Sequence, residues 1–180
     1  MPDAAPLVDA LAQVDHGTGS VTGVVDGRAF AVMDSVSATV DSRGATPGTY
    51  AELFLTSTPG FCDDVEHRIN RANSSVFAAQ IVKASPNRAE APTGPGTYTI
   101  ATSSSASGPV ATGGFLDYDA ACAPTPRARA TGGTVTVTSV VGDIYAGSFD
   151  LSLDTGEHVT GTFSPGGCPA LDGPAQTLCR

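Results

Sequence analysis

Apolar and small polar side chains alternate along most of residues 134–163, and this pattern constrains the fold more than any other feature of the chain. Side chains two residues apart lie on the same face of a β-strand, so the alternation predicts strands with one buried and one solvated face. Gly142-Asp143 and Asp154-Thr155-Gly156 interrupt it with residues typical of turns. We therefore predict a three-strand antiparallel meander. The predicted inward positions are Val135, Val137, Tyr145, Gly147, Phe149, Leu151, Leu153, Val159, Gly161 and Phe163.

The composition extends this prediction to the rest of the chain. Val occurs 17 times and Thr 21 times, against 9 Leu, and β-branched side chains favour pleated sheet over helix. The 21 Gly and 13 Pro residues indicate frequent turns. We predict an all-β fold, an antiparallel β-sandwich or barrel of about 8–10 short strands.

Turn motifs mark some strand ends. Asp26-Gly27 lies between the candidate strands 20–25 and 29–32, which predicts a β-hairpin because both residues suit positive φ. Pro-Gly-Thr-Tyr occurs at 47–50 and again at 95–98. Each copy suits a type II turn followed by a strand.

One short α-helix is predicted near residues 63–73. Val65, Ile69 and Ala72 share a face at helical spacing, and Asp63 is suited to cap the first turn. The predicted helix follows Cys62 directly.

A single domain is expected for 180 residues. We expect residues 1–17 to be an N-terminal tether, residues 18–165 the β-sandwich domain, and residues 166–180 a Cys-containing tail. Met1 is not followed by the basic and apolar segments of a signal peptide. If the chain is exported, as the cysteines indicate below, its signal peptide has been removed, and a lipid anchor at the native N-terminus is one form of attachment.

The charge balance argues against two classes of partner. Eighteen acidic residues outnumber nine basic ones, the formal net charge is −9, and Lys83 is the only lysine. Nucleic acids and anionic membranes are bound by clustered Lys and Arg, so neither is expected as a partner. No apolar run approaches the roughly 20 residues that span a bilayer, so no transmembrane segment is expected.

The four cysteines are Cys62, Cys122, Cys168 and Cys179, and none forms a C-x-x-C pair of the kind found in zinc ribbons or thioredoxin-like sites. An even count with few lysines predicts two disulfides and an oxidising compartment, and the alternative is four free thiols in a cytosolic protein. Three pairings are open. We favour Cys62–Cys122 with Cys168–Cys179, because the second bond would close a short Gly/Pro-rich tail.

Several segments resemble uncharacterised exported bacterial β-domains, many of them lipoprotein-like. The resemblance lies in residues 133–139, 146–151 and 159–163 with Cys168 soon after, and it covers about residues 20–168. The Pro-Gly-Thr-Tyr segments and the Pro-Gly-Phe-Cys segment before the helix also fit it. The resemblance implies an exported β-domain, and it carries no known activity.

One candidate for a metal site is the cluster of Asp63, Asp64, Glu66 and His67. His67 lies one helical turn from Asp63 or Asp64, a spacing at which both side chains could ligate a metal. Acidic residues at a helix start are equally explained by the helix dipole, which leaves His67 facing solvent. We therefore expect no metal and no other cofactor.

A candidate binding face comes from the solvated side of the meander. Thr134, Thr136 and Thr138 would point outward, with Thr160 and Thr162 on a neighbouring strand. Such hydroxyl arrays can bind ordered water or polysaccharide, although Thr is also a common solvent-facing residue of strands.

The function expected from these features is a non-catalytic, exported β-domain with a structural or adhesive binding role in the periplasm, at the outer surface or outside the cell. Its partner would be a cell-surface protein or a glycan. One alternative is a β-barrel that carries a small apolar ligand inside it. The other is a hydrolase, for which Asp154-Thr155-Gly156 resembles the aspartic-protease motif and His158 is a further candidate.

Overall fold

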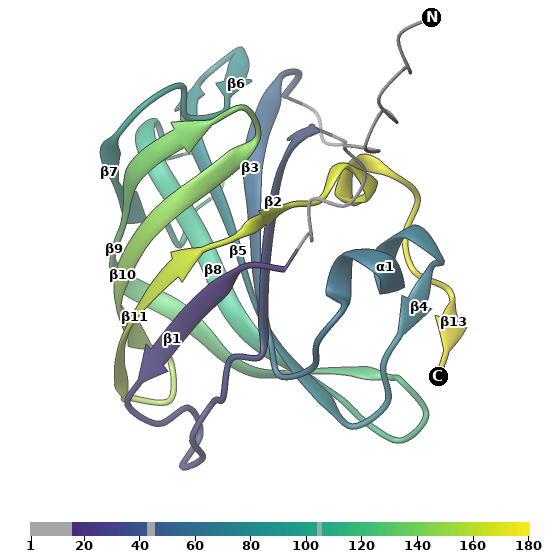
Figure 1. The fold of residues 1–180 in the computed structure, drawn as a ribbon. Coiled ribbons are helices and arrows are strands. Elements are labelled where there is room, and N and C mark those ends of the chain that lie inside the picture. Colours follow the sequence, from purple (N-terminus) through teal and green to yellow (C-terminus); the bar gives the residue numbers. More distant parts are fainter. Residues whose placement is uncertain (1–15, 43–45, 104–105) are drawn as a thin grey trace, which may run out of the picture.

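The alternating segment forms the predicted meander, three antiparallel strands in sequence order (Figure 1). They are β9 (Pro124–Val141), β10 (Ile144–Leu153) and β11 (His158–Ser164). Val135, Phe149 and Val159, all predicted to face inward, are at most 3 % exposed. Burial of one face along a period-two pattern thus fixes the register of all three strands.

Within the residues that the computed structural model describes, 16–42, 46–103 and 106–180, the meander belongs to a sheet of eleven strands. The sheet is nearly closed into a barrel, which confirms the all-β class and selects the barrel over the sandwich (Figure 1). Its order is β1-β11-β10-β9-β7-β8-β5-β3-β2-β12, with β6 beside β5. The remaining strands of this sheet are β1 (Thr18–Thr22), β2 (Asp34–Asp41), β3 (Thr49–Thr56), β5 (Ser74–Ser85), β6 (Arg88–Glu90), β7 (Gly96–Ile100), β8 (Gly108–Tyr118) and β12 (Gly166–Gly167).

The long strand β9 changes partner along its length. Its first part pairs antiparallel with β8, up to Arg129 opposite Gly114. Its later part pairs antiparallel with β7, where Thr97 faces Thr136. The short strand β7 therefore fills the wedge where β8 and β9 diverge, and it brings its own side chains beside the meander.

Side-chain hydrogen bonds help to close the barrel where β2 meets β10. The Ser37 hydroxyl donates to the Asp143 carbonyl (3.2 Å) and accepts from the Tyr145 N–H (3.1 Å). The Thr39 hydroxyl lies 2.5 Å from the Tyr145 hydroxyl. On the same strand β2, Gly166 of β12 pairs in parallel with Val36.

Side chains fill the interior of the barrel. The rings of Phe77 on β5 and Phe149 on β10 stack with their centroids 4.9 Å apart, and Phe115 on β8 lies 4.9 Å from Phe77. Tyr98 and Tyr145 are also almost fully buried. This packing gives no support to the carriage of an apolar ligand inside the barrel.

A small lobe covers the outer side of β2 (Figure 1, right). Its elements are α1 (Phe61–Glu66), β4 (Ile69–Asn70), the 3₁₀ helix η1 (Pro169–Asp172) and β13 (Leu178–Cys179). Val36 of β2 packs there against Val65 and the cysteines of one disulfide. The carboxylate of Asp34, which is fully buried, accepts the N–H of Phe61 (2.9 Å) and so caps the first turn of α1 from a neighbouring strand.

The predicted short α-helix is confirmed, but its bounds were wrong. α1 ends at Glu66, because Arg68 adopts positive φ (57°) and Ile69–Asn70 pairs in parallel with Leu178–Cys179. Helical periodicity at 63–73 was therefore overridden by a tertiary strand contact.

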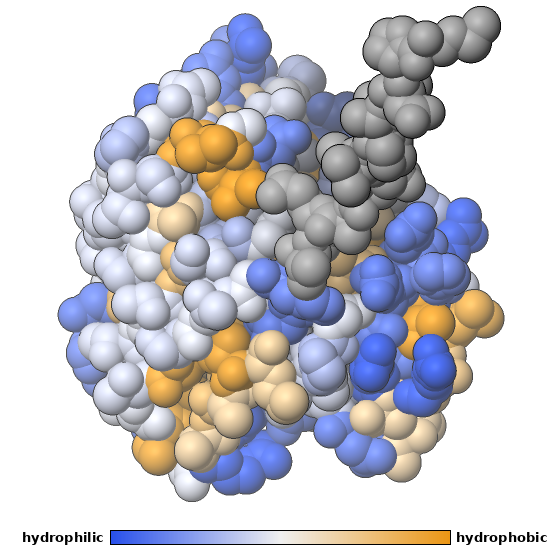
Figure 2. Space-filling model, viewed as in Figure 1, coloured by the Kyte–Doolittle hydropathy of each residue, from blue (hydrophilic) through white to orange (hydrophobic). Residues whose placement is uncertain are grey.

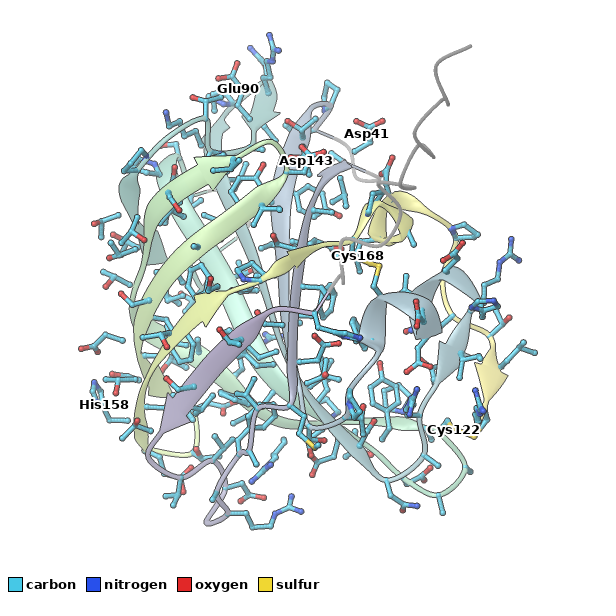
Figure 3. All side chains as sticks on the ribbon, in the orientation of Figure 1. Asp41, Glu90, Cys122, Asp143, His158 and Cys168 are labelled. Carbon is cyan, nitrogen blue, oxygen red and sulfur yellow. A yellow bond between two sulfur atoms is a disulfide. The ribbon has the colours of Figure 1, made fainter. Side chains whose placement is uncertain are left out.

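Both disulfides form, but the favoured pairing was wrong. Cys62 bonds Cys168 and Cys122 bonds Cys179, with Cα atoms 5.5 and 5.6 Å apart. The tail is part of the lobe through η1 and β13, and Cys179 lies beside the loop between β8 and β9 that holds Cys122 (Figure 3). The closure of the short tail that favoured the other pairing does not occur.

The Asp26-Gly27 turn is confirmed, but its flanking runs do not form a hairpin. Asp26 and Gly27 both have positive φ (48° and 71°), and Val25 and Arg28 form an isolated bridge. β1 pairs instead with β11. The expected tether at residues 1–17 lies, except for its last two residues, outside the described residues.

Candidate functional site

The predicted hydroxyl array is present and larger than the sequence indicated. Thr134 and Thr136 on β9 do not lie directly beside Thr160 and Thr162 on β11, because β10 runs between them. β10 contributes Ser148 and Asp150 to the array, and β1 and β7 extend it on either side. We call this surface the hydroxyl face: Ser20, Thr22, Thr97, Thr99, Thr134, Thr136, Ser148, Asp150, Thr160 and Thr162.

The hydroxyl face consists of two complete cross-strand rows over β1, β11, β10, β9 and β7. The first row, in that strand order, is Ser20, Thr162, Ser148, Thr136 and Thr97. The second row is Thr22, Thr160, Asp150, Thr134 and Thr99. Neighbouring strands lie about 4.8 Å apart and residues two apart on a strand about 6.7 Å, so the face is a regular lattice.

Some hydroxyls of the face are bonded to each other. Ser20 Oγ lies 2.9 Å from Thr162 Oγ1, and Thr97 Oγ1 lies 3.4 Å from Thr136 Oγ1. Each hydroxyl has one donor and two acceptor sites, so these contacts leave hydrogen-bonding capacity for a ligand.

Four of the five strands surround a depression of about 360 Å³. Eight members of the hydroxyl face line it, all except the two of β7, and Phe149 and Gly161 complete its lining. At the inward position 161 of β11, a Cβ would lie 2.2 Å from both Phe149 Cζ and the backbone oxygen of Ser20, so only glycine fits there. In Figure 2 the surface over β1, β11, β10 and β9, on the left of the view, is mostly pale, the colour between the blue of hydrophilic and the orange of hydrophobic residues.

Thr138, the fifth predicted threonine, is not part of the rows. A β-bulge between Ala146 and Gly147 shifts the register of β10 against β9 at this point. The Thr138 hydroxyl donates instead to the Ala146 carbonyl (3.2 Å).

Asp150 is the one charged member of the hydroxyl face. Its Oδ1 lies 2.7 Å from Nε2 of His158, and the two side chains are 63 % and 58 % exposed. Figure 3 shows His158 at the edge of the barrel, on the opposite side of the view from Cys122. Asp150 was not among the predicted site residues, because only the strand register places it between two threonines.

The structure does not gather the four candidate metal ligands. Asp64 is 3 % exposed and its carboxylate is bonded to the Arg71 guanidinium. His67 Nδ1 lies 2.8 Å from the backbone oxygen of Asp63. Across the described residues, no group of three or more His, Cys, Asp or Glu side chains is placed to hold a metal ion.

The Asp154-Thr155-Gly156 segment is the turn between β10 and β11. Asp154 Oδ1 accepts the N–H of Arg129 (2.9 Å), and Gly156 has positive φ (88°). His158 contacts Asp150 rather than Asp154. The motif thus has a structural role in joining this turn to β9.

A charged cluster that sequence analysis missed lies at one end of the barrel, in a depression of about 490 Å³. Asp117 accepts hydrogen bonds from Ser75 (2.6 Å) and Arg28 (2.6 Å), and Arg127 lies 3.6 Å away. Burial by itself would raise the pKa of Asp117, but the Ser75 and Arg28 hydrogen bonds and the two cations lower it overall. Because Arg127 also donates to the Val25 carbonyl (2.6 Å), this cluster fastens the Asp26-Gly27 turn to the barrel.

A third depression, of about 540 Å³, lies on the outer surface of β3, β5 and β8. Part of its lining is Ala78 and Gly114, which face each other across β5 and β8. The rest of its lining mixes small residues with large apolar and charged ones, among them Phe54, Leu116 and Arg129, whereas the depression at the hydroxyl face is lined by a repeated set of hydrogen-bonding groups.

No helix among the described residues is both long enough and apolar enough to cross a lipid bilayer. A scan against models of protein families, a search of curated proteins and a search of solved structures each found no match to this chain.

Proposed function

We propose that this protein is a non-catalytic, exported binding domain that uses the hydroxyl face as its contact surface. The observation that carries the proposal is the completeness of the two rows. Five strands, three of them the consecutive strands of the meander and two (β1 and β7) from distant segments, each place a hydroxyl or carboxylate at both row positions. Nine of the ten side chains are Ser or Thr, in a chain where charged residues make up 15 %.

A rigid base supports such a surface. Beneath the two rows lie inward side chains such as Val135, Phe149 and Val159, which are fully or almost fully buried. A lattice held on packed strands keeps its groups in place before a ligand arrives, which reduces the entropy lost on binding.

The two disulfides support the proposal that this domain is exported. Such bonds form and persist in oxidising compartments, which include the periplasm and the exterior of the cell. We therefore propose that the protein works in the periplasm, at the outer surface or outside the cell.

Binding to a panel of hydrated surfaces tests the proposal. Co-sedimentation measures binding to cellulose particles, chitin particles and calcium-alginate gel, and the amount of protein taken up into growing ice measures binding to ice. The test variant replaces Thr136, Thr160 and Thr162 by Val, which keeps the β-branched shape and removes three hydroxyls. The control replaces Thr112, an exposed residue of β8 outside the face, by Val. We expect the wild type and the control to bind at least one member of the panel, and the triple variant to bind it at least about tenfold more weakly.

Two results would contradict the proposal. One is that the wild type binds no member of the panel. The other is that the triple variant binds as tightly as the wild type. Unchanged far-UV circular dichroism and an unchanged melting midpoint establish that each variant is folded.

A further inference from the structure

The shape of the hydroxyl face favours a chain-like partner over a flat one. The rows run around a barrel, so their outer surface curves from β1 to β7. Along four of these strands the face lines a depression. A flat crystal plane, such as that of ice, would touch only part of a curved and hollowed surface, whereas a flexible polymer can follow it.

The repetition of the hydroxyls favours a partner that itself repeats polar groups. From β1 to β9 the face spans three inter-strand steps, about 14 Å, with a hydroxyl or carboxylate at each step of both rows. Hydrogen bonds between neutral groups compete with water and are weak one at a time, so several must form together. A sugar polymer offers hydroxyl donors and acceptors at every unit.

The charge of the face and of the chain favours a neutral polymer. Asp150 is the one charged group in the two rows, and the chain carries a formal net charge of −9. An acidic polymer would be repelled, and the face contains no Lys or Arg to pair with its anions. The apolar and aromatic side chains that anchor most protein interfaces are absent from the ten residues of the face.

Asp150 has the properties of a central anchor for such a chain. It is the third of five residues in its row, between Thr160 and Thr134. An ionised carboxylate only accepts hydrogen bonds, and bonds to it are stronger than those between neutral groups. His158 holds Oδ1 at 2.7 Å, so Oδ2 is the oxygen that we assign to a ligand hydroxyl.

We infer that the partner of the hydroxyl face is a neutral polysaccharide that crosses the strands in the depression, with a sugar hydroxyl donating to Asp150. This inference rests on the proposed function and adds to it the chemical class of the partner and the residue at its centre.

Affinity electrophoresis in native gels tests the inference. The gels contain soluble neutral polysaccharides built from glucose, galactose, mannose or xylose, and a parallel gel contains alginate. The test variant is Asp150→Asn, which keeps the shape and removes the charge. The matched control is Asp63→Asn, at an exposed aspartate of α1 outside the face. We expect retardation by at least one neutral polysaccharide, a dissociation constant about tenfold larger for Asp150→Asn, and no change for Asp63→Asn.

The outcomes separate this inference from the proposed function. Binding to alginate or ice alone that is lost in the Thr136, Thr160 and Thr162 triple variant overturns the neutral polysaccharide and leaves the hydroxyl face as the contact surface. Binding to a neutral polysaccharide that Asp150→Asn leaves unchanged overturns the anchor role. Binding that survives in both variants, or no binding at all, overturns the inference and the proposed function together.

Discussion

The carboxylate of Glu157 accepts a hydrogen bond of 2.7 Å from the backbone N–H of Gly27, although 130 residues separate them. It also accepts the neighbouring N–H of Asp26 at 2.5 Å. Successive N–H groups of a tight turn converge on one point and form a site suited to an anion. A side chain from the turn between β10 and β11 fills that site and joins the two turns at one end of the barrel.

This contact predicts a pH-dependent contribution to stability. The hydrogen bond from Gly27, with those from Asp26 and Thr155, lowers the pKa of Glu157 below its ordinary value of 4.5. The folded state therefore favours the ionised carboxylate, so the stabilisation is complete above pH 4.5 and is lost as the pH falls through the lower, folded value. We expect Glu157→Gln to melt below the wild type at pH 7, and this difference to shrink at pH 3.

Thermal melts at several pH values measure this effect. Glu66→Gln, at an exposed glutamate of α1, controls for the loss of one negative charge. A difference between wild type and Glu157→Gln that stays constant from pH 7 to pH 3 would contradict the assignment.

The disulfide pairing predicts a specific peptide map. Cleavage after Arg and Lys and before Asp places each cysteine on a separate peptide, with the cut at Asp172 separating Cys168 from Cys179. Under non-reducing conditions we expect Cys62 linked to Cys168 and Cys122 linked to Cys179. A peptide pair that links Cys62 to Cys122 would show that the structure is wrong at this point. Removal of either bond is expected to cost about 2–5 kcal/mol.

The closure of the barrel predicts opposite outcomes for two serines of β2. Ser37 is fully buried and bonds both the Asp143 carbonyl and the Tyr145 N–H. Ser37→Ala leaves these backbone groups unpaired, so we expect a loss of about 1–3 kcal/mol. Ser35 is equally buried, but its hydroxyl has no hydrogen-bond partner among the described residues. We expect Ser35→Ala to be neutral or stabilising.

Urea unfolding of the two variants measures this contrast. Equal losses in Ser35→Ala and Ser37→Ala would mean that the side-chain bonds between β2 and β10 do not hold the barrel closed.

Much of the fold could be predicted because its signals are local. The alternation from Thr134 to Phe163 fixes strands and their buried faces without reference to the rest of the chain. The bounds of α1 depend on a distant segment instead, since β13 pairs with Ile69–Asn70. The prediction of the disulfide pairing was wrong for the same reason, because tertiary contacts such as the pairing of β13 with β4 decide where the tail lies.

The candidate site was predicted only in part. Thr134, Thr136, Thr160 and Thr162 were expected to face solvent, and all four line the depression. The contributions of β1, β7 and β10 depend on strand order and register, which no local pattern encodes. The alternation correctly predicts that Asp150 points outward from its strand, but nothing in the sequence places it at the centre of a row.

Backbone amide NMR tests the central claim most directly, because it locates a binding surface without altering the protein. The uniformly ¹⁵N-labelled protein is titrated with neutral oligosaccharides of glucose, galactose, mannose and xylose. We expect at least one of them to shift the resonances of residues 20–22, 134–136, 148–150 and 160–162, while the resonances around Thr112 on β8 stay in place. Shifts confined to the outer side of β3, β5 and β8, or no shifts with any of these sugars, would contradict it.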